Sequence, residues 1–173
     1  MKRLQDKRIL LTGAARGIGA TCARVFVNEG ARVFLVDRDE AALVALADEL
    51  SLRGAEVKAC VLDISSKPDV EAAVAEMVEA FGGVDVLVNN AGITRDALTA
   101  KLSEEAFDAV IAINLKAPLL CTQAVFPHMK AQGHGVILSA SSVSALGNVG
   151  QANYAASKSG LIAMTKTWAL EFA

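Results

Sequence analysis

Short apolar runs alternate along the chain with longer segments that are rich in alanine. The runs are nearly continuous in valine, isoleucine and leucine, which is typical of strands that are buried on both faces of a sheet. We expect five strands, at residues 8–12, 31–37, 56–63, 84–89 and 135–140. Helices are expected between and after these strands, at about residues 17–29, 39–53, 67–81, 103–131 and 152–173.

Polar and small residues mark where several of these helices begin and end. Ser66 followed by Pro68, and Ser103 followed by two glutamates, are helix-start signals. Glycines at positions 30, 54, 82 and 83 stand where helices should stop. The strict alternation of strand and helix predicts a right-handed parallel sheet with helices on both faces, a doubly wound three-layer α/β/α fold.

Composition and charge restrict the class of protein. Hydrophobic residues make up 53% of the 173 residues and charged residues 21%, which excludes a disordered chain. The net charge of −2 offers no basic field for nucleic acid. The longest stretch without charged residues, 131–157, is rich in serine, glycine and asparagine, so we expect no membrane span.

The cysteines and histidines bear on the compartment and on metal binding. The three cysteines lie far apart and no secretion signal precedes them, so we expect a reduced, cytoplasmic protein. The two histidines are six residues apart with no carboxylate or thiol cluster nearby, so we expect no metal site.

The loop after the first expected strand carries a glycine pattern, Thr12-Gly13-Ala14-Ala15-Arg16-Gly17-Ile18-Gly19. Gly13 permits a tight turn, Gly17 lets the backbone approach a pyrophosphate, and Gly19 lets helix and strand pack closely. The N–H groups at the start of the helix would then bind the phosphates. Such glycines also occur in purely structural turns, and a flavodoxin-like sheet is the alternative fold. Their place between strand and helix favours a Rossmann-type dinucleotide site.

An acidic residue at the end of the second strand bears on the choice of cofactor. Asp37 lies twenty residues after Gly17, where a carboxylate accepts hydrogen bonds from the adenosine ribose and repels a 2′-phosphate. The alternative is that Asp37 caps the helix that begins near Glu40. Arg16 and Arg38 could instead pair with a 2′-phosphate. We favour NAD, with NADP as the alternative.

A tyrosine and a lysine near the end of the chain form a candidate proton-transfer pair. Tyr154 and Lys158 are four residues apart and share one face of a helix. A tyrosine has an ordinary pKa of about 10, and a nearby ammonium favours the phenolate. Ser141 lies thirteen residues before Tyr154 in the charge-free loop, where three neighbouring serines compete for the same role.

Together these motifs resemble the short-chain dehydrogenase/reductase family. The motifs that carry the resemblance are Thr12-Gly-x-x-x-Gly-x-Gly19, Asn89-Asn90-Ala91-Gly92, Asn114, Ser141 and Tyr154-x-x-x-Lys158. The resemblance implies hydride transfer with a nicotinamide cofactor. It implies that Tyr154 exchanges a proton with the substrate oxygen, that Ser141 hydrogen-bonds that oxygen, and that Asn114 anchors a relay water. Lys158 would lower the pKa of the tyrosine and hold the nicotinamide ribose.

The resemblance also implies a set of cofactor-binding residues. Asn90, Ala91 and Gly92 would support the sheet beside the cofactor, and Asp63 would contact the adenine ring, unless Asp63 is a helix-capping acid before Ser65. The full expected set is Gly13, Arg16, Gly17, Ile18, Gly19, Asp37, Asp63, Asn90, Ala91, Gly92, Tyr154 and Lys158.

Within that family, the segments 92–96 and 147–154 are most similar to 3-oxoacyl-(acyl-carrier-protein) reductases. This resemblance implies a 3-oxoacyl or 3-hydroxyacyl thioester, or a similar ketone or secondary alcohol, as substrate, with acyl carrier protein as a candidate partner. Those reductases typically use NADPH, whereas Asp37 favours NAD, and an acidic carrier protein needs more basic surface than Lys130 provides. The alternatives are an NAD-dependent dehydrogenase of another secondary alcohol or 3-hydroxyacyl-CoA, and a non-catalytic nucleotide-binding fragment.

Three further expectations concern the later helices and the end of the chain. Pro118 has no N–H to bond the carbonyl of Asn114, so we expect a kink that exposes this carbonyl. A Rossmann-type sheet has about six strands, so we expect a single NAD(P)-binding domain over residues 1–173 that is truncated after its fifth βα unit. We expect a dimer or tetramer in which the two last helices pair across a two-fold axis, unless their apolar excess faces the sheet. The apolar residues behind this last expectation are Leu119, Leu120, Val125, Leu161, Met164 and Trp168.

Overall fold

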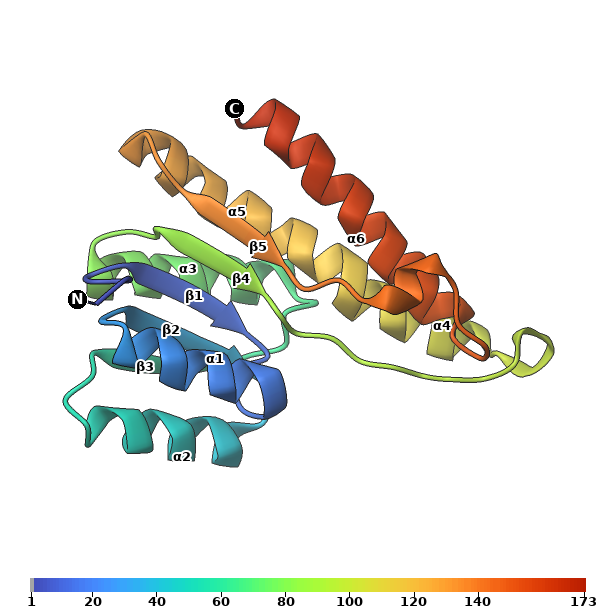
Figure 1. Cartoon of the computed structure of the whole chain (residues 1–173), viewed down its shortest axis with the longest axis horizontal. Coiled ribbons are helices and arrows are strands. Elements are labelled where there is room, and N and C mark those ends of the chain that lie inside the picture. The colour runs from blue at the N-terminus through green and yellow to red at the C-terminus, as the bar shows by residue number, and fades with distance from the viewer. Residues whose placement is uncertain (1) are drawn as a thin grey trace.

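A five-stranded parallel sheet forms the centre of the protein in the computed structural model, which describes residues 2–173 (Figure 1). Its strand order is β3-β2-β1-β4-β5, and all neighbouring strands are parallel. The strands are β1 (Arg8–Thr12), β2 (Arg32–Asp37), β3 (Val57–Val61), β4 (Val86–Asn89) and β5 (Val136–Ser139). All five lie within the ranges expected from the apolar runs.

Helices cover both faces of the sheet. They are α1 (Gly17–Asn28), α2 (Glu40–Ser51), α3 (Lys67–Phe81), α4 (Glu104–Ile111), α5 (Ala117–Gln132) and α6 (Ala152–Glu171). In Figure 1, α1 and α2 lie in front of the sheet, α3 and α5 lie behind it, and α6 runs alongside α5. The stacked rings of Phe126 and Phe172, 3.9 Å apart, join α5 to the end of α6. The fold is therefore the predicted Rossmann-type, three-layer α/β/α arrangement.

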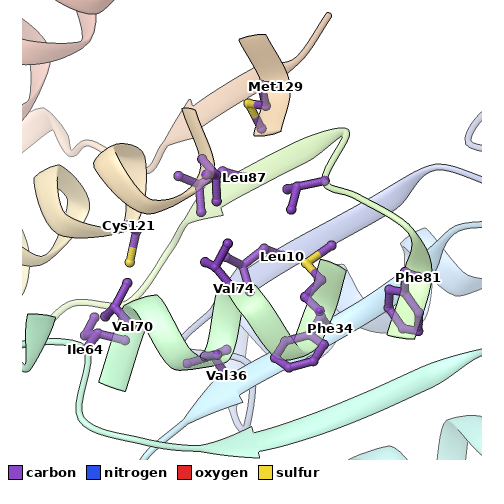
Figure 2. Packing of buried hydrophobic residues seen from close by; sticks show 14 of the residues in the cluster. Leu10, Phe34, Val36, Ile64, Val70, Val74, Phe81, Leu87, Cys121 and Met129 are labelled. Carbon is purple, nitrogen blue, oxygen red and sulfur yellow. The ribbon is translucent and has the colours of Figure 1, made fainter. Parts of the chain in front are cut away.

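The core consists of two apolar layers, one on each side of the sheet. Leu10, Phe34 and Leu87 point toward α3 and α5 (Figure 2). Their chain neighbours Leu11 and Leu35 point the other way, into the layer formed by α1 and α2. Successive strand residues point to opposite faces, so a strand that is covered on both sides must be apolar at every position. This explains the continuous apolar runs.

The helix expected at 103–131 is divided by a π-turn over Ala112–Lys116. The N–H of Ala117 bonds the carbonyl of Ala112, five residues back, instead of the usual four. Pro118 follows at once and has no N–H to give the Asn114 carbonyl in the α-helical pattern. The expected irregularity at Asn114 is present, in the form of a π-turn that begins before the proline. Asn114 is nevertheless fully buried, so its carbonyl is not exposed to solvent as expected.

The segment Glu104–Gln132 is long and apolar enough to cross a membrane by length and composition alone. In the structure its residues Val110, Ala117 and Val125 are fully buried, and the last two belong to the layer against α3 and the sheet. A core helix of an α/β protein has the same composition, and the packing gives this segment that role.

The order of the strands reverses between β1 and β4, which are neighbours although β2 and β3 separate them in the chain. Ligands of open α/β sheets bind at the carboxyl ends of the strands beside such a switch point. The loops after β1, β4 and β5 leave the sheet on this side (Figure 1).

Candidate active site

The glycine loop between β1 and α1 is closed tightly by its backbone. Gly13 has a φ of +65°, and a Cβ there would lie 2.7 Å from the Cα of Ala91. A Cβ on Gly19 would lie 1.9 Å from the carbonyl oxygen of Gly13. Both positions therefore need glycine, because any side chain would collide with backbone.

The start of α1 is open where the rest of the loop is closed. Arg16, Gly17 and Ile18 are exposed, Ile18 to 75%, and a Cβ on Gly17 would meet no atom within 4 Å. The free N–H groups of the helix therefore face unfilled space, which suits an anionic group such as a pyrophosphate. Because the start of α1 is open, the residues of the glycine loop fit a bound dinucleotide.

The segment after β4 forms the floor of the glycine loop. The hydroxyl of Thr12 accepts hydrogen bonds from the N–H groups of Asn90 and Ala91, both at 3.2 Å. The Asn90 side-chain amide donates to the carbonyls of Thr12 and Gly13, both at 3.0 Å. The structure thus brings Asn90 and Ala91 together with the glycine loop, as the sequence predicts.

Asp37 lies half-buried at the end of β2, beside the same loop. Its carboxylate accepts hydrogen bonds from the N–H groups of Ala15 and Asp39, both at 3.0 Å. The helix cap of α2 is Asp39, whose carboxylate accepts the N–H of Ala42 at 3.1 Å. The alternative interpretation of Asp37 as the helix cap is therefore wrong. Asp39 also forms an ion pair with Arg16.

Asp63 lies in the turn that follows β3. Its carboxylate accepts the N–H of Ser65 at 2.9 Å, and this bond is the main reason that the pKa of Asp63 is lowered. The helix α3 is capped at Ser66. The contacts thus support a role of Asp63 in holding the turn before α3. Its contact with the adenine ring stays a prediction.

Ser141, Tyr154 and Lys158 lie together where β5 ends and α6 begins. The Nζ atom of Lys158 donates to the Ala140 carbonyl at 2.7 Å and lies 5.6 Å from the centre of the Tyr154 ring. The Ser141 hydroxyl donates to the backbone carbonyl of Lys158 at 3.3 Å. A Cβ on Gly92 would lie 3.6 Å from Lys158 Nζ, so the segment after β4 reaches the same place.

Lys158 is a buried cation. Only 3% of it is exposed, and burial lowers the pKa of its ammonium. Among residues 2–173 no carboxylate forms an ion pair with it. The protein therefore accepts the cost of an unpaired buried charge, which is typical of a functional site.

The Asn114 side chain holds the segment after β4 in place. This side chain is fully buried in the π-turn; its amide donates to the Ile93 carbonyl at 2.9 Å and accepts the Ile93 N–H at 2.8 Å. It also donates to the Ser157 hydroxyl at 3.3 Å. The contacts give Asn114 a positioning role through its side chain, whereas the relay water expected at its carbonyl stays a prediction.

Two further polar residues of α6 were not among the predicted site residues. The fully buried Asn153 accepts the N–H of Tyr154 at 2.8 Å and donates to the Arg95 carbonyl at 2.9 Å. The buried Ser157 donates to the Tyr154 carbonyl at 2.7 Å. Their signal in the sequence is their position, because each directly precedes one of the two chemical residues.

The two loops around the site meet and expose apolar side chains. The side-chain amide of Gln151 donates to the Asp96 carboxylate at 2.9 Å, which joins segment 92–96 to segment 147–154. The N–H of Ala97, directly after the first segment, donates to the Gly150 carbonyl at 2.8 Å. Val143, Leu146 and Val149 are at least 85% exposed on the second loop. An apolar rim beside a proton-transfer group suits an apolar substrate.

The fold is of the Rossmann type, and comparisons with known proteins identify the family. A family model described as short chain dehydrogenase matches residues 7–173. The 3-oxoacyl-(acyl-carrier-protein) reductase of Thermotoga maritima is 46% identical over 172 residues, which cover 99% of this chain and 70% of that protein. The chain therefore belongs to the short chain dehydrogenase family, and it is a nicotinamide-dependent oxidoreductase.

Other relatives carry different names, of which one gives a CoA ester as substrate and one gives no substrate. The (2S)-((R)-hydroxy(phenyl)methyl)succinyl-CoA dehydrogenase subunit BbsD of Thauera aromatica is 42% identical over 168 residues, 97% of this chain and 68% of that protein. The short-chain reductase protein NovJ of Streptomyces niveus is 42% identical over 167 residues, 96% of this chain and 64% of that protein. The family is thus common to relatives with different substrates.

Proposed function

We propose that the protein transfers a hydride between a nicotinamide cofactor and a 3-oxoacyl or 3-hydroxyacyl thioester. The observation that carries this proposal is the position of Lys158 beside Gly92. The Lys158 carbonyl accepts the Ser141 hydroxyl, its ammonium lies 5.6 Å from the centre of the Tyr154 ring, and exposed apolar residues lie on the neighbouring loop. Two of the relatives described above are named for acyl thioesters, one on acyl carrier protein and one on CoA. The acyl chain of such a thioester is apolar, and the exposed apolar residues beside the site suit it.

A bound nicotinamide would supply or accept the hydride, and residues of the protein would handle the proton. Tyr154 moves a proton between its phenolic oxygen and the substrate oxygen. Ser141 donates a hydrogen bond to that oxygen. Its hydroxyl has one proton, which now goes to the Lys158 carbonyl, so the hydroxyl must rotate when the substrate binds. Lys158 places positive charge beside the Tyr154 ring and would hold the nicotinamide ribose.

We further propose NAD as the preferred nicotinamide cofactor, with NADP as the alternative. Asp37 lies at the end of β2 beside the glycine loop and offers carboxylate oxygens to the ribose. The exposed residues Arg16 and Arg38 are the features that favour NADP. In this proposal the chain forms one dinucleotide-binding domain and is cytoplasmic. Acyl carrier protein is a candidate partner.

A homo-oligomer is also part of the proposal, but it needs other residues than those first expected. Leu120, Val125, Leu161 and Trp168 are all less than 8% exposed within a single chain, so they offer little surface to a second copy. Their burial supports the alternative that the apolar excess faces the interior of its own chain, and the pairing of the two last helices stays a prediction. Exposed apolar residues such as Leu170 are available instead.

Consumption of NADH with acetoacetyl-CoA as substrate tests the proposed reaction. Turnover with this thioester and little turnover with a simple ketone, such as acetone, supports the proposal. Turnover with simple ketones alone identifies a dehydrogenase of another secondary alcohol. A change in NADH fluorescence without turnover on either substrate identifies a nucleotide-binding protein without this activity.

A further inference from the structure

An ion pair spans the loops where the adenosine ribose of the proposed cofactor would bind. Arg16 directly precedes α1, Asp39 directly precedes α2, and the Arg16 guanidinium pairs with the carboxylate oxygen Oδ2 of Asp39. The other oxygen, Oδ1, accepts the Ala42 N–H at the start of α2. The two oxygens of Asp39 thus have separate tasks, one toward the helix and one toward Arg16.

Asp39 is also attached to Asp37. The Asp39 N–H donates to Asp37 Oδ1 at 3.0 Å, and Asp37 Oδ2 accepts the Ala15 N–H from the glycine loop. The two carboxylates are therefore fixed in one turn. A phosphate close to Asp37 would meet the negative charge of both carboxylates. Arg16, the cation directly before α1, already has Asp39 as its partner.

The second candidate cation, Arg38, also has an acidic neighbour. The positive charge of Arg38 helps to lower the pKa of Asp63, although the Ser65 amide contributes more. Both arginines that could pair with a 2′-phosphate therefore lie close to carboxylates of this chain.

We propose that Asp39 is a specificity-determining residue, which withholds Arg16 from a 2′-phosphate and thereby favours NAD(H) over NADP(H). This inference rests on the proposed dinucleotide site. The Arg16 side chain is 75% exposed and that of Asp39 32%, so the ion pair contributes little to stability. Its loss should therefore change the recognition of the phosphate and leave the fold intact.

The Asp39→Asn substitution separates the two tasks of Asp39. An asparagine keeps an oxygen to accept the Ala42 N–H and removes the negative charge that holds Arg16. We expect Asp39→Asn to strengthen NADPH binding about tenfold and to change NADH binding less than twofold. Fluorescence titration of both nucleotides measures these dissociation constants without turnover.

Two further variants make the test specific. In the double variant Arg16→Gln with Asp39→Asn the gain in NADPH affinity should disappear, because the freed guanidinium is absent. Asp48→Asn removes the same charge from an exposed position of α2 and should leave both affinities unchanged.

The outcomes also separate this inference from the proposed function. If the wild-type protein binds neither nucleotide, the proposed function fails. If it binds nucleotides but Asp39→Asn leaves the ratio of the two affinities unchanged, the role of Asp39 is refuted. An equal gain in NADPH affinity in Asp48→Asn likewise refutes the role of Asp39, because the change in net charge would then explain the gain. A gain in the double variant also refutes it, because Arg16 is then not needed.

Discussion

Lys158 holds its ammonium 5.6 Å from the centre of the Tyr154 ring, one turn further along α6. The same ammonium donates to the Ala140 carbonyl at the end of β5. The cation therefore links the helix that carries the tyrosine to the strand that leads to Ser141. Both the chemistry and the stability of this region should depend on it.

Replacing Tyr154 with Phe should lower kcat by about 10²–10⁴-fold, the range that general acid–base catalysis contributes. Phe keeps the ring beside Lys158 and removes only the hydroxyl that exchanges the proton. The affinity for NADH, measured by fluorescence titration, should stay within about twofold because the hydroxyl acts on the substrate. A rate close to that of the wild type would contradict the role of Tyr154.

Replacing Lys158 with Met should raise stability at neutral pH while activity falls. Burial lowers the pKa of Lys158, so the unfolded chain holds its proton more tightly than the folded one. The cost of the buried charge is present below the folded pKa and declines as pH rises toward the ordinary lysine value of about 10.4. A gain of about 1 kcal/mol would raise Tm by ~2–4 °C.

Thermal unfolding over a pH series tests this sign. The difference between Lys158→Met and the wild type should shrink as pH rises. Lys166→Met, at an exposed position of the same helix, should alter neither Tm nor activity. A lower Tm of Lys158→Met at neutral pH would mean that the bond to Ala140 outweighs the burial of the charge.

Replacing Asn114 with Ala should destabilise the protein, because the N–H and carbonyl of Ile93 both lose their partner. Each unsatisfied backbone group costs about 1–3 kcal/mol. Ser157→Ala removes a hydroxyl that bonds both Asn114 and Tyr154, and should cost about 0.5–1.5 kcal/mol for each bond. Urea unfolding compares the two variants, and equal stability of Asn114→Ala and the wild type would exclude the positioning role.

The sequence predicts the strands and most helices well because the strands form nearly continuous apolar runs and because small and polar residues mark where several helices begin and end. It cannot predict the π-turn at Ala112–Lys116, because a shift from four to five residues per hydrogen bond leaves no distinct apolar period. Pro118 indicates that the helix is irregular there, but not which irregularity forms. That depends on contacts such as those between Asn114 and Ile93, far apart in the sequence.

The sequence predicts those parts of the site whose residues lie close together in the chain. Tyr154 and Lys158 share a helix face by geometry, and the glycine loop follows from its place between strand and helix. The sequence does not identify Asp39 as the cap of α2, because Asp37 and Asp39 both precede the helix and both carry a carboxylate. The contact of Arg16 with Asp39 depends on how two separate loops fold together.

Stability should fall in acid through the pair of Arg8 and Asp85. The Arg8 guanidinium holds the pKa of Asp85 well below its usual range, and this pair is largely buried. A lowered folded pKa gives stability that is present above the unfolded value of about 4 and is lost as pH falls through the folded value.

Asp85→Asn should therefore cost about 3 kcal/mol at neutral pH, since Arg8 is left without its counter-charge. It should also show a weaker loss of stability below about pH 4 than the wild type. Urea unfolding at neutral and acidic pH measures both effects. If Asp85→Asn loses as much stability in acid as the wild type, other carboxylates cause the loss.

The last prediction concerns β5, which lies at one edge of the sheet. Val136 and Leu138 are each 51% exposed, and the four residues of β5 carry no charge. An open groove of about 810 Å³ adjoins this strand, away from Tyr154, and is lined in part by Phe126, Ile137 and Trp168. The other edge strand, β3, carries Lys58, and charged residues, lysine above all, protect edges from pairing with another chain.

We expect chains of residues 1–173 to associate through the β5 edge. Leu138→Lys should reduce this association, measured by sedimentation and light scattering over a concentration series, because a lysine on an edge strand opposes pairing with another chain. Val61→Lys is the matched control, since Val61 is 46% exposed on the protected edge β3. If both substitutions reduce association equally, added charge alone explains the effect and the β5 edge is not the contact. If Leu138→Lys leaves association unchanged, the chains meet elsewhere.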